Sequence, residues 1–545
     1  MANSPTTLIV AIALVIPLFS KLSQTTFVSI NCGSSEPFTD PQTNITWTQD
    51  DAYIDHGQSF NVSLGLGTFS TLRAFHNNTL RKNCYEIEVQ KGEKVLTRAS
   101  FFYGNYDDKF SPPVFDLIFD GNYWGTVITS ISDHVDYEAI YVTKGNYTNV
   151  CVSQSNPNHI PFISSIEVRG LKPQMYNHID QNHSLILLSR RAFGANQTVR
   201  YPDDEFDRIW SAKNSEQEFI YSIKSEALDI NTSTVEDQPP KSAIQNAFTL
   251  PNKTFGIQYN LSSLLQSTSN NNSNYYYYNN IVPLYINTYF SEVVVNATIG
   301  TRSMQIHIGN NDDNNGPLFS SRPIIPPFGS VEQVHINMSI SSDSKMMNSL
   351  YFHATPASTL PPLINAAEVY RVEPLATGTD SRDVKGLREL QLGFKRLSEW
   401  KGDPCLPFPY NWEWIKCTAD PIPRVKALYL NSYDLHGILP DIRSMDALEI
   451  IDLHNNSIQG SIPEFLGFLP LLRALNLSHN GFSGYIPTSL NNTDIDIDLS
   501  NLPELQKIVS TRTSDSGRTW ILSFELHILL VLLILAMQVL LPHLL

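Results

Sequence analysis

The sequence has few cysteines and few charged residues, and basic residues are not in excess. Five cysteines in 545 residues are too few for a disulfide scaffold, so packed cores must supply most of the stability. Charged residues make up 17% and give a formal net charge of −16, whereas nucleic-acid binders need a basic surface. Apolar residues reach 42%, which excludes wholesale disorder. We therefore expect folded domains and no nucleic-acid partner.

The sequence also lacks the common signatures of catalysis and metal binding. It contains no GxSxG, HExxH or phosphate-loop motif, and its 14 histidines show no zinc spacing. Paired carboxylates occur at Asp50-Asp51 and Asp203-Asp204. Sequence neighbours on a strand point to opposite faces, so neither pair suits acid/base chemistry. We predict a protein that is not an enzyme and that uses no cofactor and no metal.

Long apolar runs occur only near the two ends. The run 8–19 has the length of a signal-peptide core, which predicts a signal peptide over residues 1–23. Residues 520–545 form a second apolar segment, with no Lys or Arg after Arg518. A stretch of small residues that includes Ser514 and Ser516 precedes it. This order fits a glycolipid-anchor signal, in which the apolar tail is removed and one of these serines receives the lipid. The alternative is a single transmembrane helix.

Either a glycolipid anchor or a transmembrane helix would place the body of the protein on the extracellular face of the plasma membrane, where the C-terminal tail holds it. Asn-x-Ser/Thr sequons spread along the chain agree with passage through a glycosylating compartment. The fifteen acceptor candidates are Asn44, Asn61, Asn77, Asn146, Asn182, Asn196, Asn231, Asn252, Asn260, Asn271, Asn296, Asn337, Asn455, Asn476 and Asn491.

Residues 26–370 are rich in short apolar segments separated by turn-forming residues. In 114–119, for example, one face is fully apolar, and Asp-Gly follows as a turn signal. Such a pattern is typical of β-sandwiches. The length predicts two tandem lobes, at 26–205 and 206–372, joined near 201–210.

The spacing of the apolar residues changes after the second predicted lobe. Apolar residues recur at helical spacing over 383–400, with Asp380 or Asp383 as a possible N-cap. After this helix, four Leu/Ile-x-Leu strands recur every 22–24 residues, beginning at Leu428, and matching Gly and Pro turns follow the first three. Asn456 and Asn480 fit the buried asparagine ladder of a leucine-rich repeat. The pattern predicts a repeat solenoid over 424–500, a helical cap over 380–420 and a linker over 501–519.

Several motifs together resemble the plant malectin-like and leucine-rich-repeat receptor-like proteins. The motifs are the segments 27–33, 98–107, 111–116, 120–124, 161–164, 201–204 and 360–366, and the cap sequence from Trp400 to Cys417. This resemblance implies a mainly β fold: tandem malectin-like jelly-roll sandwiches followed by a short solenoid with a helical N-terminal cap. Relatives often continue into a kinase. Only about 45 residues follow the last repeat here, so we expect a receptor-like protein that lacks a kinase domain.

The resemblance also bears on the cysteines and on ligands. Cys405 and Cys417 fit the disulfide of the cap, while the pairing of Cys32, Cys84 and Cys151 stays open. The resemblance implies lobes that bind sugars through aromatic rings and nearby acceptors. The candidate ligand-binding residues, for which a role in the core is the alternative, are Tyr103, Tyr106, Asp107, Asp120, Tyr123 and Trp124.

These observations lead to one functional prediction and one alternative. We predict a cell-surface receptor-like protein that binds a cell-wall oligosaccharide or a peptide and acts with a receptor kinase as co-receptor. The alternative is an adhesion protein that tethers wall polysaccharide to the membrane without signalling.

Overall fold

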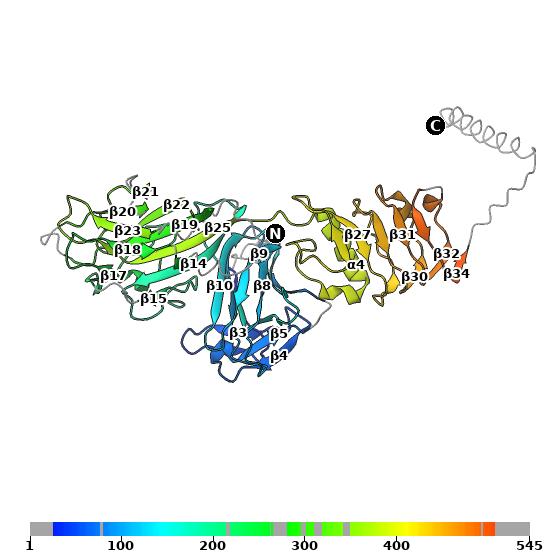
Figure 1. Ribbon diagram of the computed structural model, residues 1–545, viewed down its shortest axis with the longest axis horizontal. Coiled ribbons are helices and arrows are strands. Elements are labelled where there is room, and N and C mark those ends of the chain that lie inside the picture. The colour runs from blue at the N-terminus through cyan, green and yellow to red at the C-terminus, as the bar shows by residue number, and fades with distance from the viewer. Residues whose placement is uncertain are drawn as a thin grey trace, which may run out of the picture.

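The computed structural model describes residues 25–76, 80–213, 219–261, 263–264, 281–295, 301–309, 319–341, 349–491 and 494–506. Two β lobes and a solenoid lie in a row, with the N-terminal lobe in the middle (Figure 1). The predicted signal peptide, the anchor segment with Ser514 and Ser516, and most of the linker lie outside these residues.

The first lobe is a β-sandwich, as expected. One layer has the strand order β2-β3-β1-β13-β7-β10, and the other consists of the sheets β6-β11-β8-β9 and β12-β5-β4. Its elements are β1 (Phe27–Asn31), β2 (Phe38–Thr39), β3 (Thr46–Gln49), β4 (Gln58–Asn61), η2 (Gly67–Phe69), β5 (Thr71–Ala74), β6 (Lys82–Glu88), β7 (Lys94–Phe101), β8 (Val114–Phe119), β9 (Asn122–Ile128), β10 (Val135–Val142), β11 (Tyr147–Ser153), β12 (Phe162–Ile163) and β13 (Ser165–Gly170).

The second lobe repeats this architecture. Strands β14, β25, β19 and β22 form one layer, and the sheets β18-β23-β20-β21 and β16-β17-β24 form the other. Its elements are β14 (His183–Phe193), β15 (Ser211–Lys213), β16 (Tyr221–Lys224), α2 (Lys241–Ile244), β17 (Asn246–Thr249), β18 (Ile257–Asn260), β19 (Ile281–Phe290), β20 (Met304–Gly309), β21 (Phe319–Ser320), β22 (Glu332–Ser341), β23 (Ser349–Ala354), β24 (Leu363–Ile364) and β25 (Ala366–Pro374).

The two lobes share one continuous sheet of eleven strands. Strand β10 of lobe 1 pairs with β14, and β14 pairs with β25 along almost its whole length. The boundary predicted at residue 205 is therefore corrected: the chain enters lobe 2 before β14, and residues 200–210 return to the junction. Each lobe keeps its own apolar core, because the side chains of the second layer pack against only one half of the shared sheet.

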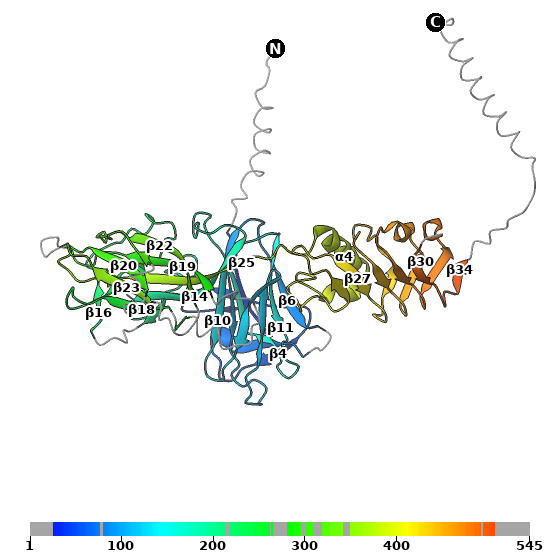
Figure 2. The ribbon, with the colours of Figure 1, turned by 45° about the horizontal axis from the view of Figure 1, so that its top comes forward.

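The cap and the solenoid follow lobe 2 in sequence but pack against lobe 1 (Figure 2). Asp380 caps helix α4 by accepting a hydrogen bond from the backbone N–H of Arg382, while Asp383 is buried and pairs with Arg424. The elements are α4 (Ser381–Gly393), η4 (Lys395–Glu399), β26 (Ile415–Cys417), β27 (Val425–Tyr429), β28 (His436–Ile438), β29 (Ile450–Asp452), β30 (Ser457–Ser461), η5 (Glu464–Phe468), β31 (Ala474–Asn476), β32 (Gly481–Tyr485), η6 (Thr488–Leu490), β33 (Asp496–Asp498) and β34 (Glu504–Gln506).

The repeats form two parallel sheets. The predicted Leu/Ile-x-Leu strands become β27, β29, β31 and β33, and the turns after them form the second sheet, β28-β30-β32-β34. Asn456 and Asn480 bond backbone groups of neighbouring repeats through both side-chain atoms, as the ladder pattern predicts. Strand β34 lies in the region expected to be a linker, so the solenoid extends further than predicted.

The cysteines divide into two disulfides and one thiol. Cys405 and Cys417 are bonded within the cap, and Cys84 and Cys151 are bonded across β6 and β11. Cys32 is free and buried, and burial raises the pKa of its thiol. This arrangement settles the pairing that the sequence left open.

Lobe 1 contacts the cap through several polar groups. The ammonium group of Lys82 donates to the carbonyl groups of Asp403 and Leu406 at 2.5 and 2.9 Å. The Tyr410 hydroxyl donates to Asp116 at 2.6 Å. Gly402 lies directly over the Cys84–Cys151 disulfide, where a Cβ atom would approach the Cys84 Sγ to 2.7 Å.

Candidate functional site

A row of buried charges crosses the shared sheet from lobe 1 to lobe 2. Five neighbouring strands each contribute one residue to this row, and the sign of the contributed charge alternates from strand to strand. The order is Glu167 on β13, Arg98 on β7, Glu138 on β10, Arg190 on β14 and Glu368 on β25. All five side chains are buried. We call them the charge ladder.

Arg190 joins the two halves of the charge ladder. Its guanidinium group contacts Glu138 of lobe 1 at 2.6 Å and Glu368 of lobe 2 at 2.7 Å. Burial alone would raise the pKa of Glu138, but Arg190 and Arg98 hold it below its usual value. Charges buried this deeply are tolerated only when each has a partner. The ladder therefore fixes how the two lobes sit relative to each other.

The segment 200–210 folds back over the charge ladder. Asp207 accepts hydrogen bonds from Arg169 and Arg200, and its backbone carbonyl accepts one from Arg98. Asp204 binds Arg208 and the indole N–H of Trp210 at 2.8 and 2.7 Å. Asp203 and Asp204 are thus separated: Asp204 is buried in an ion pair and Asp203 is exposed.

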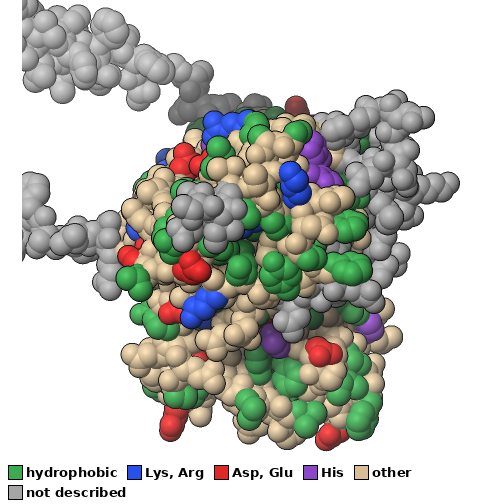
Figure 3. Space-filling model, turned by 90° about the vertical axis from the view of Figure 1, so that its left-hand side faces the viewer, with side chains coloured by type: hydrophobic (Ala, Val, Ile, Leu, Met, Phe, Trp, Pro, Cys, Tyr) green, Lys and Arg blue, Asp and Glu red, His purple; other side chains and the backbone are tan. Residues whose placement is uncertain are grey.

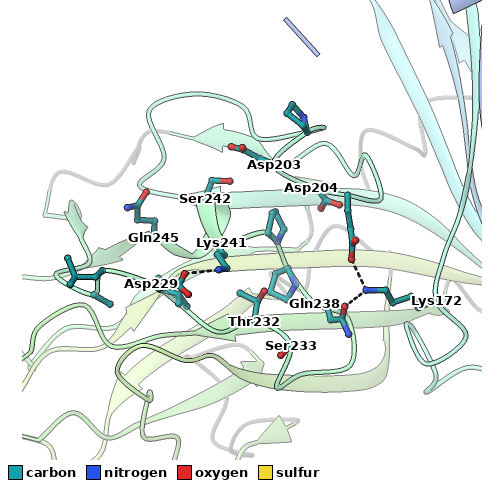
Figure 4. A pocket seen from close by; sticks show the side chains of 17 residues that line it. Lys172, Asp203, Asp204, Asp229, Thr232, Ser233, Gln238, Lys241, Ser242 and Gln245 are labelled. Atoms are coloured by element: carbon teal, nitrogen blue, oxygen red, sulfur yellow. Dashed lines mark hydrogen bonds and ion pairs between the residues drawn. The ribbon is translucent and has the colours of Figure 1, made fainter. Parts of the chain in front are cut away.

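A cleft of about 760 Å³ opens beside this segment (Figure 4). Its walls come from three stretches that are distant in sequence: Lys172 after β13, residues 202–205, and loop residues between Ala227 and Gln245. Its volume falls within the range of small-ligand sites. We call it the interlobe cleft, because Lys172 and residues 202–205 belong to the junction between the lobes.

The interlobe cleft is polar and slightly acidic. Lys172 bonds Glu205 at 2.7 Å and Gln238 at 2.8 Å, and Lys241 pairs with Asp229 at 2.7 Å. These pairs neutralise both lysines, while Asp203 has no ion pair within the described part of the chain. The lining includes Pro202, Pro239, Pro240 and Leu228 but no aromatic ring. The cleft can thus bind polar and cationic groups, but it offers no ring on which a sugar could stack.

The aromatic residues predicted to bind sugar lie elsewhere. Tyr103 and Trp124 are buried in the core of lobe 1, and Trp124 packs edge-on against Phe119. The Tyr103 hydroxyl donates to Asp107 at 2.5 Å, while Tyr106 packs beside the Tyr103 ring. Tyr103 and Trp124 are therefore core residues and present no ring face to a ligand.

The predicted group is also split between the two ends of strand β8. Tyr103, Tyr106 and Asp107 precede the strand, whereas Asp120, Tyr123 and Trp124 follow it. Asp120 accepts hydrogen bonds from Thr148 and from the backbone N–H of Asn149 at 2.7 Å, and burial raises its pKa to about 6. The Tyr123 hydroxyl contacts Thr126. The structure does not bring the six residues together into one site.

The sequons are largely accessible. Twelve of the fifteen acceptor asparagines lie in the described residues; eleven of these side chains are exposed and Asn476 is half-buried. Asn77, Asn271 and Asn296 lie outside the described residues. Figure 3 views lobe 2 from the end distant from the solenoid, where charged and apolar side chains are intermixed. Exposure on this scale is compatible with glycosylation along the whole chain.

Within the described residues no group of three or more His, Cys, Asp or Glu residues is arranged to hold a metal ion. No helix in the described chain is long and apolar enough to cross a membrane.

The sequence matches two family models. The malectin-like domain model matches residues 30–372, and the leucine-rich-repeat model matches residues 423–482. The chain belongs to the malectin-like family. Both matches agree with the fold, because residues 30–372 cover the two lobes up to β25 and residues 423–482 cover most of the solenoid.

Malectin-like relatives include receptor kinases of Arabidopsis thaliana. A probable LRR receptor-like serine/threonine-protein kinase is 28% identical over 490 residues, which are 86% of this chain and 50% of that protein. Another is 31% identical over 446 residues, which are 78% of this chain and 48% of that protein. The chain thus spans about half the length of these relatives.

Solved malectin-like structures share the fold of the two lobes. The Arabidopsis thaliana ANX2 ectodomain superposes with a TM-score of 0.50 at 14% identity, covering 64% of this chain and 97% of that one. The plant receptor-like kinase FER superposes with a TM-score of 0.50 at 15% identity, covering 64% of this chain and 96% of that one. The two lobes therefore have the fold of these two ectodomain structures.

Sequence reasoning missed both the charge ladder and the interlobe cleft. The ladder residues had only a weak signal: each is a charged residue in a strand that also contains buried apolar residues, as Arg98 is in KVLTRASF. The cleft had none, because its walls are brought together only by the pairing of the lobes.

Proposed function

We propose that this malectin-like protein is a cell-surface receptor that binds an extracellular peptide in the interlobe cleft and acts with a partner receptor kinase. The observation that carries the proposal is the cleft itself, which is polar, lacks aromatic rings and is built where two firmly joined lobes meet. The receptor-kinase names of its relatives support a role in signalling.

The charges of the interlobe cleft favour a peptide with basic side chains. Lys172 and Lys241 are already paired with carboxylates of the cleft, and Asp204 is neutralised by Arg208. Asp203 is left exposed, on a chain with a net charge of −16. The net negative charge of the chain therefore attracts a basic peptide at long range, and Asp203 attracts its basic side chains once the peptide is in the cleft.

A paired screen tests this proposal. The purified protein is tested against synthetic peptides of basic, neutral and acidic sequence and against a cell-wall glycan array. We expect binding of basic peptides that weakens at high salt. The variant Asp203→Arg should weaken it at least tenfold, because the substitution reverses an exposed charge in the cleft. Asp420→Arg is the matched control, because Asp420 is also exposed but lies on the cap.

The same screen separates the alternatives. Binding of glycans without any peptide would support the adhesion protein that tethers wall polysaccharide. Equal binding by the Asp203→Arg and Asp420→Arg variants would place the peptide site outside the cleft. Pull-down of receptor kinases from plant membranes in the presence of the bound peptide tests the second half of the proposal.

A further inference from the structure

A second groove lies between the cap and lobe 1. Its volume is about 370 Å³, and both domains line it. Glu86 of β6 and Tyr147 of β11 supply the lobe 1 side, and helix α4 supplies residues from Val384 to Leu392. We call it the cap groove. It exists only because the cap is docked on lobe 1.

The cap groove gathers apolar side chains that no segment of the described chain covers. Tyr147 is 45% exposed, Val384 is 40% exposed and Leu392 is 73% exposed. Two further leucines of the same helix, Leu387 and Leu390, are almost fully buried in the core of the solenoid, and Leu387 also lines the inner wall of the groove. Apolar side chains on a surface are usually scattered, and a cluster around a groove marks a place where something binds.

The lining combines aromatic rings with polar groups. Trp400 and Trp412 also line the cap groove, but both are largely buried, and their indole N–H groups donate to Glu413 and to the carbonyl of Lys401. Tyr147 is therefore the ring of the lining that is exposed. Glu86, Gln391, Ser398 and Arg388 add hydrogen-bonding groups. Rings beside polar groups are the surroundings in which proteins hold sugars, because the ring takes the C–H face while the polar groups take the hydroxyls.

A sugar acceptor stands next to this groove. Asn146 directly precedes Tyr147 in the sequon Asn146-Tyr147-Thr148, and its side chain is exposed. Its backbone is fixed at the end of the sheet, where its carbonyl accepts a hydrogen bond from the N–H of Val89 at 3.0 Å. A glycan attached here therefore begins one residue away from the lining of the groove.

We propose that an N-linked glycan on Asn146 lies in the cap groove and joins lobe 1 to helix α4. The sugar covers Tyr147, Val384 and Leu392 and so stabilises the contact between the two domains. Asn231 provides an internal comparison, since it adjoins the interlobe cleft in the same way but finds no ring there. The proposal needs the secretory route but not the peptide ligand, so the two proposals fail independently.

The test uses the full chain produced in a glycosylating plant host. Glycopeptide mass spectrometry should find Asn146 occupied. Hydrogen exchange should then be about threefold faster over 384–392 in Asn146→Gln than in the unmutated protein, because the groove is uncovered. The same variant should lower Tm by about 2 °C. Asn231→Gln, which removes the sequon beside the interlobe cleft, should leave exchange over 384–392 unchanged.

A second variant separates loss of the glycan from damage to the fold. Leu392→Ser changes an exposed residue on the cap side and should speed exchange in the glycosylated protein, yet add nothing once Asn146→Gln has removed the sugar. Additive effects of the two substitutions would overturn the proposal. An unmodified Asn146, or equal exchange over 384–392 in Asn146→Gln and Asn231→Gln, would overturn it as well.

Discussion

Lobe 1 has two neighbours, and it is joined to them in different ways. Its junction with lobe 2 is a continuous sheet crossed by the charge ladder, in which every charge is buried and paired. Its junction with the cap is made of separate contacts: Lys82 on two carbonyl groups, Tyr410 on Asp116, and Gly402 over a disulfide. No strand of the described chain is shared between lobe 1 and the cap.

This difference between the two junctions predicts how each one comes apart when the protein unfolds. A shared sheet with an interior ion network cannot be opened without breaking strand pairs and exposing charges, so the two lobes should unfold together. Contacts between side chains of two separate sheets can be lost while both partners stay folded. The first junction therefore builds one body, and the second holds two bodies in a fixed position. Three substitutions test this contrast, and a fourth tests a buried carboxyl group of lobe 1.

The largest effect is expected for Arg190→Ala. The substitution leaves Glu138 and Glu368 buried without their shared partner, which should cost about 3–5 kcal/mol of unfolding free energy. Chemical denaturation followed by fluorescence should show one transition shifted to lower denaturant. Two separated transitions, with one lobe unaffected, would contradict the idea of a single body.

Gly402→Ala should separate the cap from lobe 1. Its φ is +74°, and the new Cβ would collide with the Cys84 sulfur at 2.7 Å. Overpacking of this kind costs about 1–3 kcal/mol. Small-angle scattering should report a longer molecule, while the lobes keep their own stability. Gly92→Ala is the matched control, because Gly92 has a φ of +83° but nothing within 4 Å of the added atom. If both variants behave alike, backbone strain and not the contact with the disulfide is responsible.

Tyr410→Phe should weaken the same junction by less. It deletes the hydroxyl that donates to Asp116 at 2.6 Å and leaves the ring in place. Since water can reach this partly buried pair, we expect a loss of about 1 kcal/mol. Hydrogen exchange over 404–412 should rise, and exchange within lobe 2 should not change. A rise in lobe 2 would mean that the two junctions are coupled.

The smallest effect concerns pH. Burial raises the pKa of Asp120 to about 6, above the ordinary value of 3.8. The folded protein therefore holds this proton more tightly than the unfolded chain does, and the contribution of Asp120 to stability declines as the pH rises from about 4 to 6. Asp120→Asn keeps an acceptor for the N–H of Asn149 and removes the charge. Unfolding free energies measured between pH 4 and 7 should show a flatter dependence in this variant. An unchanged dependence would show that Asp120 does not titrate in this range.

The sequence predicted local features better than distant contacts. The repeats were found because each strand, its Gly/Pro turn and its ladder asparagine lie within one period of 22–24 residues. The two sandwiches followed from alternating apolar segments. The shared sheet could not be predicted, because the pairing of β10 with β14 and of β14 with β25 depends on register between strands up to about 190 residues apart.

The predicted sugar-binding residues and the interlobe cleft also depend on contacts between residues that are distant in sequence. Tyr103 and Trp124 lie beside turn residues in the sequence, which suggested exposed rings, but the second layer of lobe 1 covers them. The residues next to an aromatic side chain in the sequence do not show whether its ring is exposed at the end of a strand or covered by the second layer of the sandwich. The interlobe cleft depends on Lys172, residues 202–205 and Asp229 meeting across the junction, and no short pattern in the chain marks them as neighbours.

The position of lobe 2 in the chain has a mechanical consequence. Lobe 2 starts and finishes at paired neighbours, His183 and Pro374. Residues just beyond Pro374 return to lobe 1, where the backbone N–H of Ala376 donates to Asn122 at 2.6 Å. A force that pulls lobe 1 and the solenoid apart therefore acts on the contacts between lobe 1 and the cap. Lobe 2 does not bear this force, so the interlobe cleft keeps its shape.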